Sequence, residues 1–159
     1  MNNYKMVIAY DGTRYNGWQK QGNTNKTIQG KMEAILEKMT GEQIEIHGSG
    51  RTDAGVHALG QVANAKLNTD KTPEQIQDYI NEYLPKDIVI CSIEKVSMRF
   101  HSRLNAVRKT YCYRIHLSPV RNVFERSYVW DYGKPLDIER MKQAAQYLLG
   151  EHDFLPFCD

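Results

Sequence analysis

The order of hydrophobic patterns along the chain is the feature that most constrains its fold. Six segments between residues 4 and 96 alternate between strand-like and helix-like spacing of apolar side chains, in the order β-α-β-β-α-β. They cover residues 4–10, 27–41, 44–46, 62–67, 72–84 and 88–96. This order predicts the split β-α-β arrangement of a ferredoxin-like α+β domain, which many RNA-binding modules share.

Both predicted helices begin or end at residues that favour a helix boundary. Thr27 can act as the N-cap of the first helix, and Gly41 can end it because glycine readily adopts the left-handed conformation of a C-terminal cap. The second helix opens with the sequence Thr-Pro-Glu-Gln over residues 72–75, which has the spacing of a capping box and places proline at the first helical position. These local signals support both helices independently of the hydrophobic pattern.

The remainder of the chain predicts one more strand and one more helix. Residues 110–117 have the composition of a strand, and residues 137–149 have helical spacing, with Gly150 placed to terminate the helix. The side chains expected on the buried face of this helix are Ile138, Met141, Ala145 and Leu148. We therefore expect a ferredoxin-like domain over residues 1–100 and a further part, with a basic and aromatic strand and a helix, over residues 101–159.

A glycine-rich run at residues 48–57 connects the second and third predicted strands. It reads Gly-Ser-Gly-Arg-Thr-Asp-Ala-Gly-Val-His and holds one guanidinium, Arg51, and one carboxylate, Asp53. Its glycines permit close approach of the backbone to a ligand. Residues two apart on an extended segment point to the same side, so we expect an Arg51–Asp53 ion pair that keeps Asp53 ionised. The alternative is a tight hairpin turn in which this pair is merely solvated.

Basic residues gather in one part of the chain. The formal charge is +7 between residues 95 and 130 and −5 over the rest of the chain. Aromatic residues interleave with these cations, so groups that bind phosphates adjoin flat rings on which bases can stack. A strand with buried aromatic residues and solvated cations would show the same alternation. The net charge favours RNA as the partner.

Further motifs accompany the glycine-rich run. They are residues 8–13 with Tyr15, Gly17, Trp18 and Gln19, and residues 27–29, 100–103, 109–113 and 150–154. Together with residues 48–57, which match without a gap, they resemble the tRNA pseudouridine synthase A family over the whole chain. Members of that family are longer. The resemblance therefore implies that the chain is an N-terminal part or a truncated product, whose own turnover would be weak or absent.

The resemblance implies an isomerase that converts uridine to pseudouridine in the anticodon stem-loop of tRNA. The reaction breaks the N1–C1′ bond and joins C5 to C1′ without net redox change, so it needs no cofactor. In the family's pattern Asp53 is the essential carboxylate, Arg51 helps to hold the flipped nucleotide, and Tyr111 stacks on the target uracil. Such an aspartate could attack the sugar, add to the base or remove a ribose proton, and we favour the last, glycal, route. The resemblance also implies a homodimer.

Other interpretations use some of the same residues. A ferredoxin-like RNA-binding fragment would need only the basic segment, and an RNA nuclease or glycosidase could use Asp53 and Arg51. A glycosidase would need a second carboxylate, which the loop lacks. Tyr111 could be a core aromatic residue on a strand. His47 and His57 flank the loop without a third ligand at useful spacing, so we assign them structural roles and expect no metal.

The composition indicates a cytoplasmic protein without a membrane partner. No apolar stretch is long enough to cross a bilayer, and the N-terminus lacks the apolar core of a signal peptide. Cys91, Cys112 and Cys158 are odd in number and far apart, which suits reduced thiols better than a disulfide framework or a metal knuckle.

Overall fold

The structure, a computed structural model, describes residues 1–157 and divides into two units between Lys109 and Thr110. Cys91 and Cys112 are exposed free thiols, whereas Cys158 lies outside the described residues. Within residues 1–157, no helix has both the length and the apolar character needed to cross a membrane.

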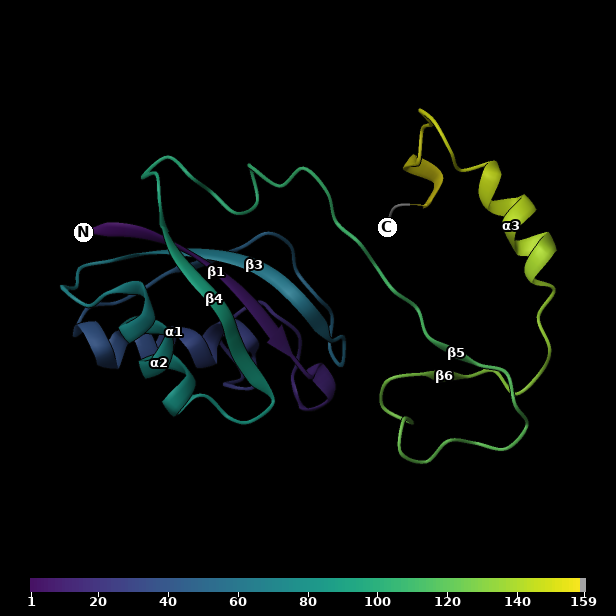
Figure 1. Ribbon diagram of the computed structural model, residues 1–159, viewed down its shortest axis with the longest axis horizontal. Helices are drawn as coiled ribbons and strands as arrows, with labels where there is room; N and C mark the ends of the chain where they lie inside the picture. Colours follow the sequence, from purple (N-terminus) through teal and green to yellow (C-terminus); the bar gives the residue numbers. More distant parts are fainter. Residues whose placement is uncertain (158–159) are drawn as a thin grey trace. The chain divides into compact units, whose positions relative to one another are not determined.

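The first unit has the predicted β-α-β-β-α-β order. Its elements are β1 (Asn2–Tyr10), the short 3-10 helix η1 (Gly12–Arg14), α1 (Ile28–Thr40), β2 (Ile46–Gly48), β3 (Ala58–Leu67), α2 (Pro73–Tyr83) and β4 (Ile88–Val96). The strands form one sheet in the order β2-β3-β1-β4, and every neighbouring pair is antiparallel. Helices α1 and α2 lie together beneath one face of this sheet (Figure 1). The predicted ferredoxin-like α+β arrangement is confirmed.

The helix boundaries follow the predicted caps. The Thr27 hydroxyl accepts a hydrogen bond from Gly30 N, and Gly41 ends α1 in the left-handed conformation with φ of 74°. At the start of α2, Thr72 and Gln75 form both hydrogen bonds of a capping box, with Pro73 at the first helical position. Local sequence therefore accounts for where these helices begin and where α1 ends.

The core lies between the sheet and its two helices. Alternate residues of β1 that face the helices, from Tyr4 to Tyr10, are buried, as expected for a strand with one face on the core. They pack with apolar residues of α1 and α2. The fully buried helix residues are Ile28, Met32, Leu36, Ile76 and Ile80. The opposite face of the sheet is left for the chain that follows β4.

Buried polar groups attach the chain after β4 to the open face of the sheet. Ser102 is 2% exposed, and its N donates to Asn64 Oδ1 over 2.9 Å. Asn64 Nδ2 donates to Asn3 Oδ1, and Asn3 Nδ2 donates to the carbonyl of Phe100. These bonds hold residues 100–103 on β1 and β3, within the compact unit that runs to Lys109.

The second unit corrects two expectations about regular structure. Instead of a strand over residues 110–117, only β5 (Ile115–His116) forms, paired in parallel with β6 (Trp130–Asp131). A segment with strand propensity becomes a strand only where a neighbouring strand pairs with it. Helix α3 (Ile138–Gln146) is shorter than predicted, since residues 147–149 continue in tighter i to i−3 turns before Gly150. Its residues expected to face inward are all exposed, because no element within residues 110–157 covers them.

Candidate active-site loop and an adjoining cleft

The run at residues 48–57, called the signature loop from here on, connects β2 and β3 as predicted. It rests on the segment that follows β1 through main-chain hydrogen bonds on both sides of Asp53. Trp18 N donates to Thr52 O over 3.0 Å, and Gly55 N donates to Tyr15 O over 3.2 Å. Tyr10 at the end of β1 adds a hydroxyl contact to Thr52 Oγ1 at 2.9 Å. The loop is therefore held by the buried N-terminal motif that accompanies it in the sequence.

Glycines allow these two segments to touch. Gly17 has φ of 88°, and a Cβ at this position would lie 2.5 Å from the carbonyl oxygen of Thr52. Within the loop, a Cβ on Gly48 would lie 2.6 Å from Nε1 of Trp18, whose indole is 2% exposed. Both positions exclude any larger residue unless the loop moves. Trp18 is thus a packing residue beneath the loop.

Asp53 presents its carboxylate to solvent. The residue is exposed, and no hydrogen bond or ion pair to the carboxylate is found within residues 1–157. Its main chain is constrained instead, because Val56 N donates to Asp53 O over 3.2 Å in the turn that Gly55 completes with φ of 80°. The loop therefore fixes the backbone of Asp53 and leaves the side chain available to a ligand.

Arg51 does not form the expected ion pair with Asp53. Its Nε donates to Gln19 Oε1 over 3.2 Å, which directs the guanidinium toward the segment after β1. Arg51 and Gln19 line a cleft that Asp53 does not line. The predicted ion pair between Arg51 and Asp53 is therefore wrong. A hydrogen bond to Gln19, which is distant in the sequence, determines the orientation of the arginine instead.

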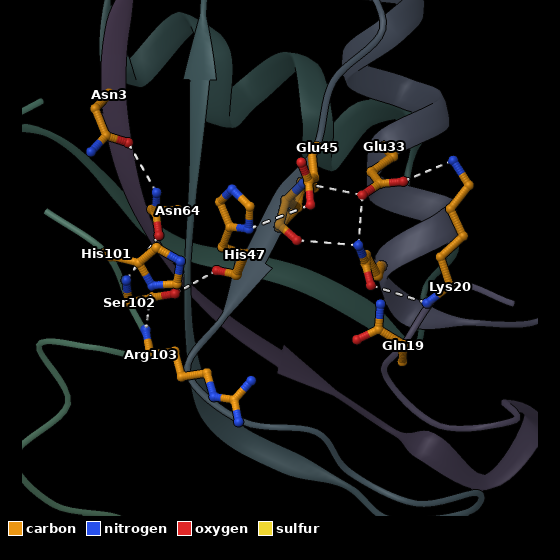
Figure 2. A network of polar contacts seen from close by, with 12 residues as sticks. Asn3, Gln19, Lys20, Glu33, Glu45, His47, Asn64, His101, Ser102 and Arg103 are labelled. Carbon is orange, nitrogen blue, oxygen red and sulfur yellow. Dashed lines mark hydrogen bonds and ion pairs between the residues drawn. The ribbon is translucent and has the colours of Figure 1, made fainter. Parts of the chain in front are cut away.

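An ion pair between a half-exposed lysine and a buried carboxylate anchors Lys20, the residue next to Gln19 (Figure 2). Glu33 on α1 is 3% exposed, and its Oε2 lies 2.9 Å from Lys20 Nζ. The other oxygen accepts hydrogen bonds from Gln29 Nε2 at 2.7 Å and from Ile46 N at 3.1 Å. The hydrogen bond and charge of Glu33 raise the pKa of Lys20. Glu33 thus joins α1, β2 and the segment that carries Gln19.

The cleft beside the signature loop has a volume of about 530 Å³ and lies wholly within the first unit. One wall of the cleft contains Gln19 and Arg51, and the opposite wall comes from residues 101–103. Ser102 Oγ donates to the carbonyl of His47 over 2.5 Å, and the His101 ring stacks on the His47 ring with centroids 4.9 Å apart (Figure 2). Sequence reasoning did not identify His101 or Arg103 as site residues. Both residues belong to residues 100–103, one of the motifs that resemble the family, and this motif was the signal that could have identified them.

The two histidines that flank the loop have separate surroundings. His47 stacks on His101, whereas His57 Nδ1 lies 3.2 Å from Gly12 N and 3.1 Å from Asp11 Oδ1. Among the described residues, no three His, Cys, Asp or Glu side chains are grouped as metal ligands would be.

Tyr111 belongs to the second unit and is 70% exposed. It lies outside every strand, so within its unit it is not a core aromatic residue on a strand. Its role toward the target uracil stays a prediction from the sequence.

Asp87, just before β4, supports the segment on which the loop rests. Tyr15 Oη donates to Asp87 Oδ1 over 2.7 Å, and Arg14 Nη2 donates to Oδ2 over 2.6 Å. Burial and the hydrogen bond to Asp87 raise the pKa of Tyr15. For Asp87 itself, burial raises the pKa, but the hydrogen bonds from Tyr15 and Arg14 outweigh it, so the net pKa is lowered.

We expect the Asp87 contacts to stabilise the fold in a pH-dependent way. Since the folded-state pKa lies below the ordinary value of 3.8, this contribution is present above pH 3.8 and is lost as the pH falls through the lower folded value. Asp87→Asn should lower the free energy of unfolding at pH 7 by about 1–3 kcal/mol and flatten its fall in acid. Urea unfolding at several pH values measures both effects. Asp78→Asn, at an exposed position on α2, is the matched control, and equal pH profiles for the two variants would contradict the assignment.

The fold and the loop define the chain as one of a class of α+β domains, in which a ferredoxin-like sheet carries a glycine-rich connection with an exposed carboxylate. Residues 6–105 match the family model described as tRNA pseudouridine synthase. The match begins within β1, extends past β4 and includes the signature loop and the residues that line the cleft other than Lys109. The chain belongs to the tRNA pseudouridine synthase family.

Curated relatives extend the similarity over nearly the whole chain. The tRNA pseudouridine synthase A of Bacillus sp. (strain KSM-64) is 53% identical over 157 residues, covering 99% of this chain and 64% of the relative. The tRNA pseudouridine synthase A 1 of Clostridium tetani is 50% identical with the same coverage, and the tRNA pseudouridine synthase A 2 of Bacillus cereus (strain ZK / E33L) is 48% identical. The chain thus spans 64% of the length of these relatives.

Proposed function

We propose that the full-length protein isomerises uridine to pseudouridine in the anticodon stem-loop of tRNA. The observation that carries the proposal is the exposed Asp53 carboxylate in the signature loop of a chain that belongs to the tRNA pseudouridine synthase family. The names of the curated relatives support tRNA as the substrate. We infer that the enzyme works in the cytoplasm as a homodimer, as the family resemblance implies.

In the proposed reaction Asp53 is the essential carboxylate. The N1–C1′ bond breaks, the uracil turns, and C5 bonds to C1′. C5 then loses its proton and N1 takes one up, so the product is an isomer of uridine. An ionised carboxylate can act on the ribose as nucleophile or as base, and the glycal route uses it as base. Asp53 suits this role because its side chain has no competing partner within the described residues.

Arg51 and Tyr111 are proposed to hold the substrate. A uridine flipped out of its stack loses a few kcal/mol of stacking and pairing, which substitute contacts must offset. Arg51 can supply a charged donor from within the loop, and the exposed ring of Tyr111 can supply a stacking face. Gln19 then orients Arg51 through its side-chain oxygen.

Release of tritium from tRNA that carries C5-tritiated uridine tests the proposal. The full-length protein should release tritium in step with pseudouridine formation and leave the RNA strand intact. Binding of tRNA without tritium release would favour the RNA-binding interpretation, and strand cleavage would favour a nuclease.

We expect Tyr111→Phe to slow pseudouridine formation while leaving tRNA affinity within about threefold, because the ring still stacks but the hydroxyl is lost. Tyr111→Ala should also weaken binding. Single-turnover rates and filter binding on the full-length variants separate the two effects. If both variants match the parent protein, Tyr111 does not contact the substrate.

A further inference from the structure

One residue of α1 holds both of the peptide groups that flank Gln19, the residue whose side chain accepts a hydrogen bond from Arg51 Nε. On one side, Gln29 N donates to the carbonyl of Trp18 over 3.0 Å. On the other side, Lys20 N donates to Gln29 Oε1 over 3.0 Å. Gln29 itself is 6% exposed. Its main chain and its side chain therefore fix the backbone at Gln19 from both sides.

The two contacts differ in how they depend on the glutamine side chain. Gln29 is the second residue of α1, where main-chain N–H groups have no acceptor within the helix. Ile28 N, one position earlier, likewise donates to the carbonyl of Gly17 over 3.2 Å. Almost any residue at these positions would supply such main-chain donors. Only the bond from Lys20 N requires the glutamine amide.

The orientation of that amide is set by acceptors on its other side. Gln29 Nε2 donates to Glu33 Oε1 over 2.7 Å and to the carbonyl of Ile46 over 3.2 Å. A carboxylate and a carbonyl can only accept, so the amide nitrogen must face them and the amide oxygen must face Lys20 N. Glu33 is 3% exposed and also accepts from Ile46 N, as the dashed lines around it in Figure 2 show. A buried network bonded in this way specifies a single arrangement.

We propose that Gln29 is a positioning residue for Arg51 and that Glu33 sets the orientation of the Gln29 amide. The inference rests on the proposed function for what Arg51 does once it is in place. Gln29 acts on the backbone at Gln19, and Gln19 Oε1 then accepts from Arg51 Nε over 3.2 Å. Arg51 is exposed, and supporting contacts of this kind hold the side chain of a site residue in one geometry.

Turnover of the full-length protein, measured by tritium release from tRNA, tests the proposal. Gln29→Met keeps the approximate size of the side chain and removes its amide, so it should lower kcat about tenfold while KM for tRNA stays within about threefold. Glu33→Met should also lower kcat, because the Gln29 amide is then able to turn over. Glu33→Gln should keep the parental kcat, since its oxygen can still accept from Gln29 Nε2 and Ile46 N. Lys20 is half-exposed and can turn to solvent in that variant.

A double-mutant cycle separates positioning from a general structural role. If Gln29 acts through Arg51, Gln29→Met should change kcat by less than about twofold in a protein that already carries Arg51→Ala. A loss of the same factor in both backgrounds would contradict the proposal. If Gln29→Met does not fold in a thermal unfolding assay, Glu33→Met takes its place in the cycle.

Exchange of the Arg51 Nε–H proton with water, followed by NMR, gives a readout that does not depend on turnover. The hydrogen bond to Gln19 should protect this proton in the parent protein, and Gln29→Met or Glu33→Met should remove the protection. Arg51→Lys assigns the signal. If the parent protein forms no pseudouridine, the proposed function fails, and the positioning of Arg51 then stands or falls with the exchange measurement.

Gln77→Met on α2 is the matched control. Gln77 Nε2 donates to the carbonyls of Ile90 and Cys91 on β4, so this substitution also removes hydrogen bonds between a helix and a strand. Gln77 does not line the cleft that contains Gln19 and Arg51. We expect parental kcat and parental protection of Arg51 Nε–H. If Gln29→Met matches Gln77→Met in both measurements, the proposal is overturned.

Discussion

Asp53→Asn in the full-length protein is expected to abolish pseudouridine formation, with a fall in turnover of about a thousandfold or more. Asparagine keeps the size of the side chain but can act neither as nucleophile nor as base. Because Asp53 is exposed and has no ion pair with Arg51 within the described residues, the free energy of unfolding should change by less than about 0.5 kcal/mol. Tritium release at saturating tRNA measures the first effect, and urea unfolding measures the second.

Asp70→Asn removes the same charge from an exposed position after β3 and serves as the control. It should leave turnover and tRNA affinity unchanged. An Asp53→Asn enzyme that forms pseudouridine at the parental rate would show that the loop carboxylate is not part of the chemistry.

Gly17→Ala is expected to have the largest effect among substitutions outside the signature loop. The alanine Cβ would be strained at φ of 88° and would collide with the carbonyl oxygen of Thr52, one residue before Asp53. We expect a loss of about 2–4 kcal/mol in the free energy of unfolding. Displacement of the loop by about 1 Å should also lower kcat/KM about a hundredfold.

Gly41→Ala separates backbone strain from the collision. Gly41 has φ of 74° at the end of α1, but a Cβ there would meet nothing within 4 Å. We expect about 1–2 kcal/mol of destabilisation and unchanged turnover for the folded protein. Equal losses of activity in the two variants would mean that the contact between Gly17 and the loop does not position Asp53.

Features that depend on neighbours in the chain were predictable from the sequence. Thr27, Gly41 and the residues of the capping box at the start of α2 act on groups within a few residues, so their geometry follows from local order. The spacing of apolar residues likewise predicted the order of the four strands and two helices of the first unit. β4 has the predicted bounds, whereas β2 (Ile46–Gly48) and β3 (Ala58–Leu67) begin later and earlier, respectively, than predicted. The position of the signature loop between β2 and β3 followed from the same pattern.

Features that depend on a distant partner were decided by the tertiary structure alone. Arg51 turns to Gln19 rather than to Asp53, and Ser102 N donates to Asn64, which holds residues 100–103 on the sheet. Strand propensity over residues 110–117 produced only β5, because a ladder needs a paired neighbour. The sequence by itself determined the order of elements and the place of the loop between two strands, since both are encoded by local spacing. The folded chain decided which side chains meet, because hydrogen bonds and packing across 30 or more positions depend on where the sheet brings the backbone.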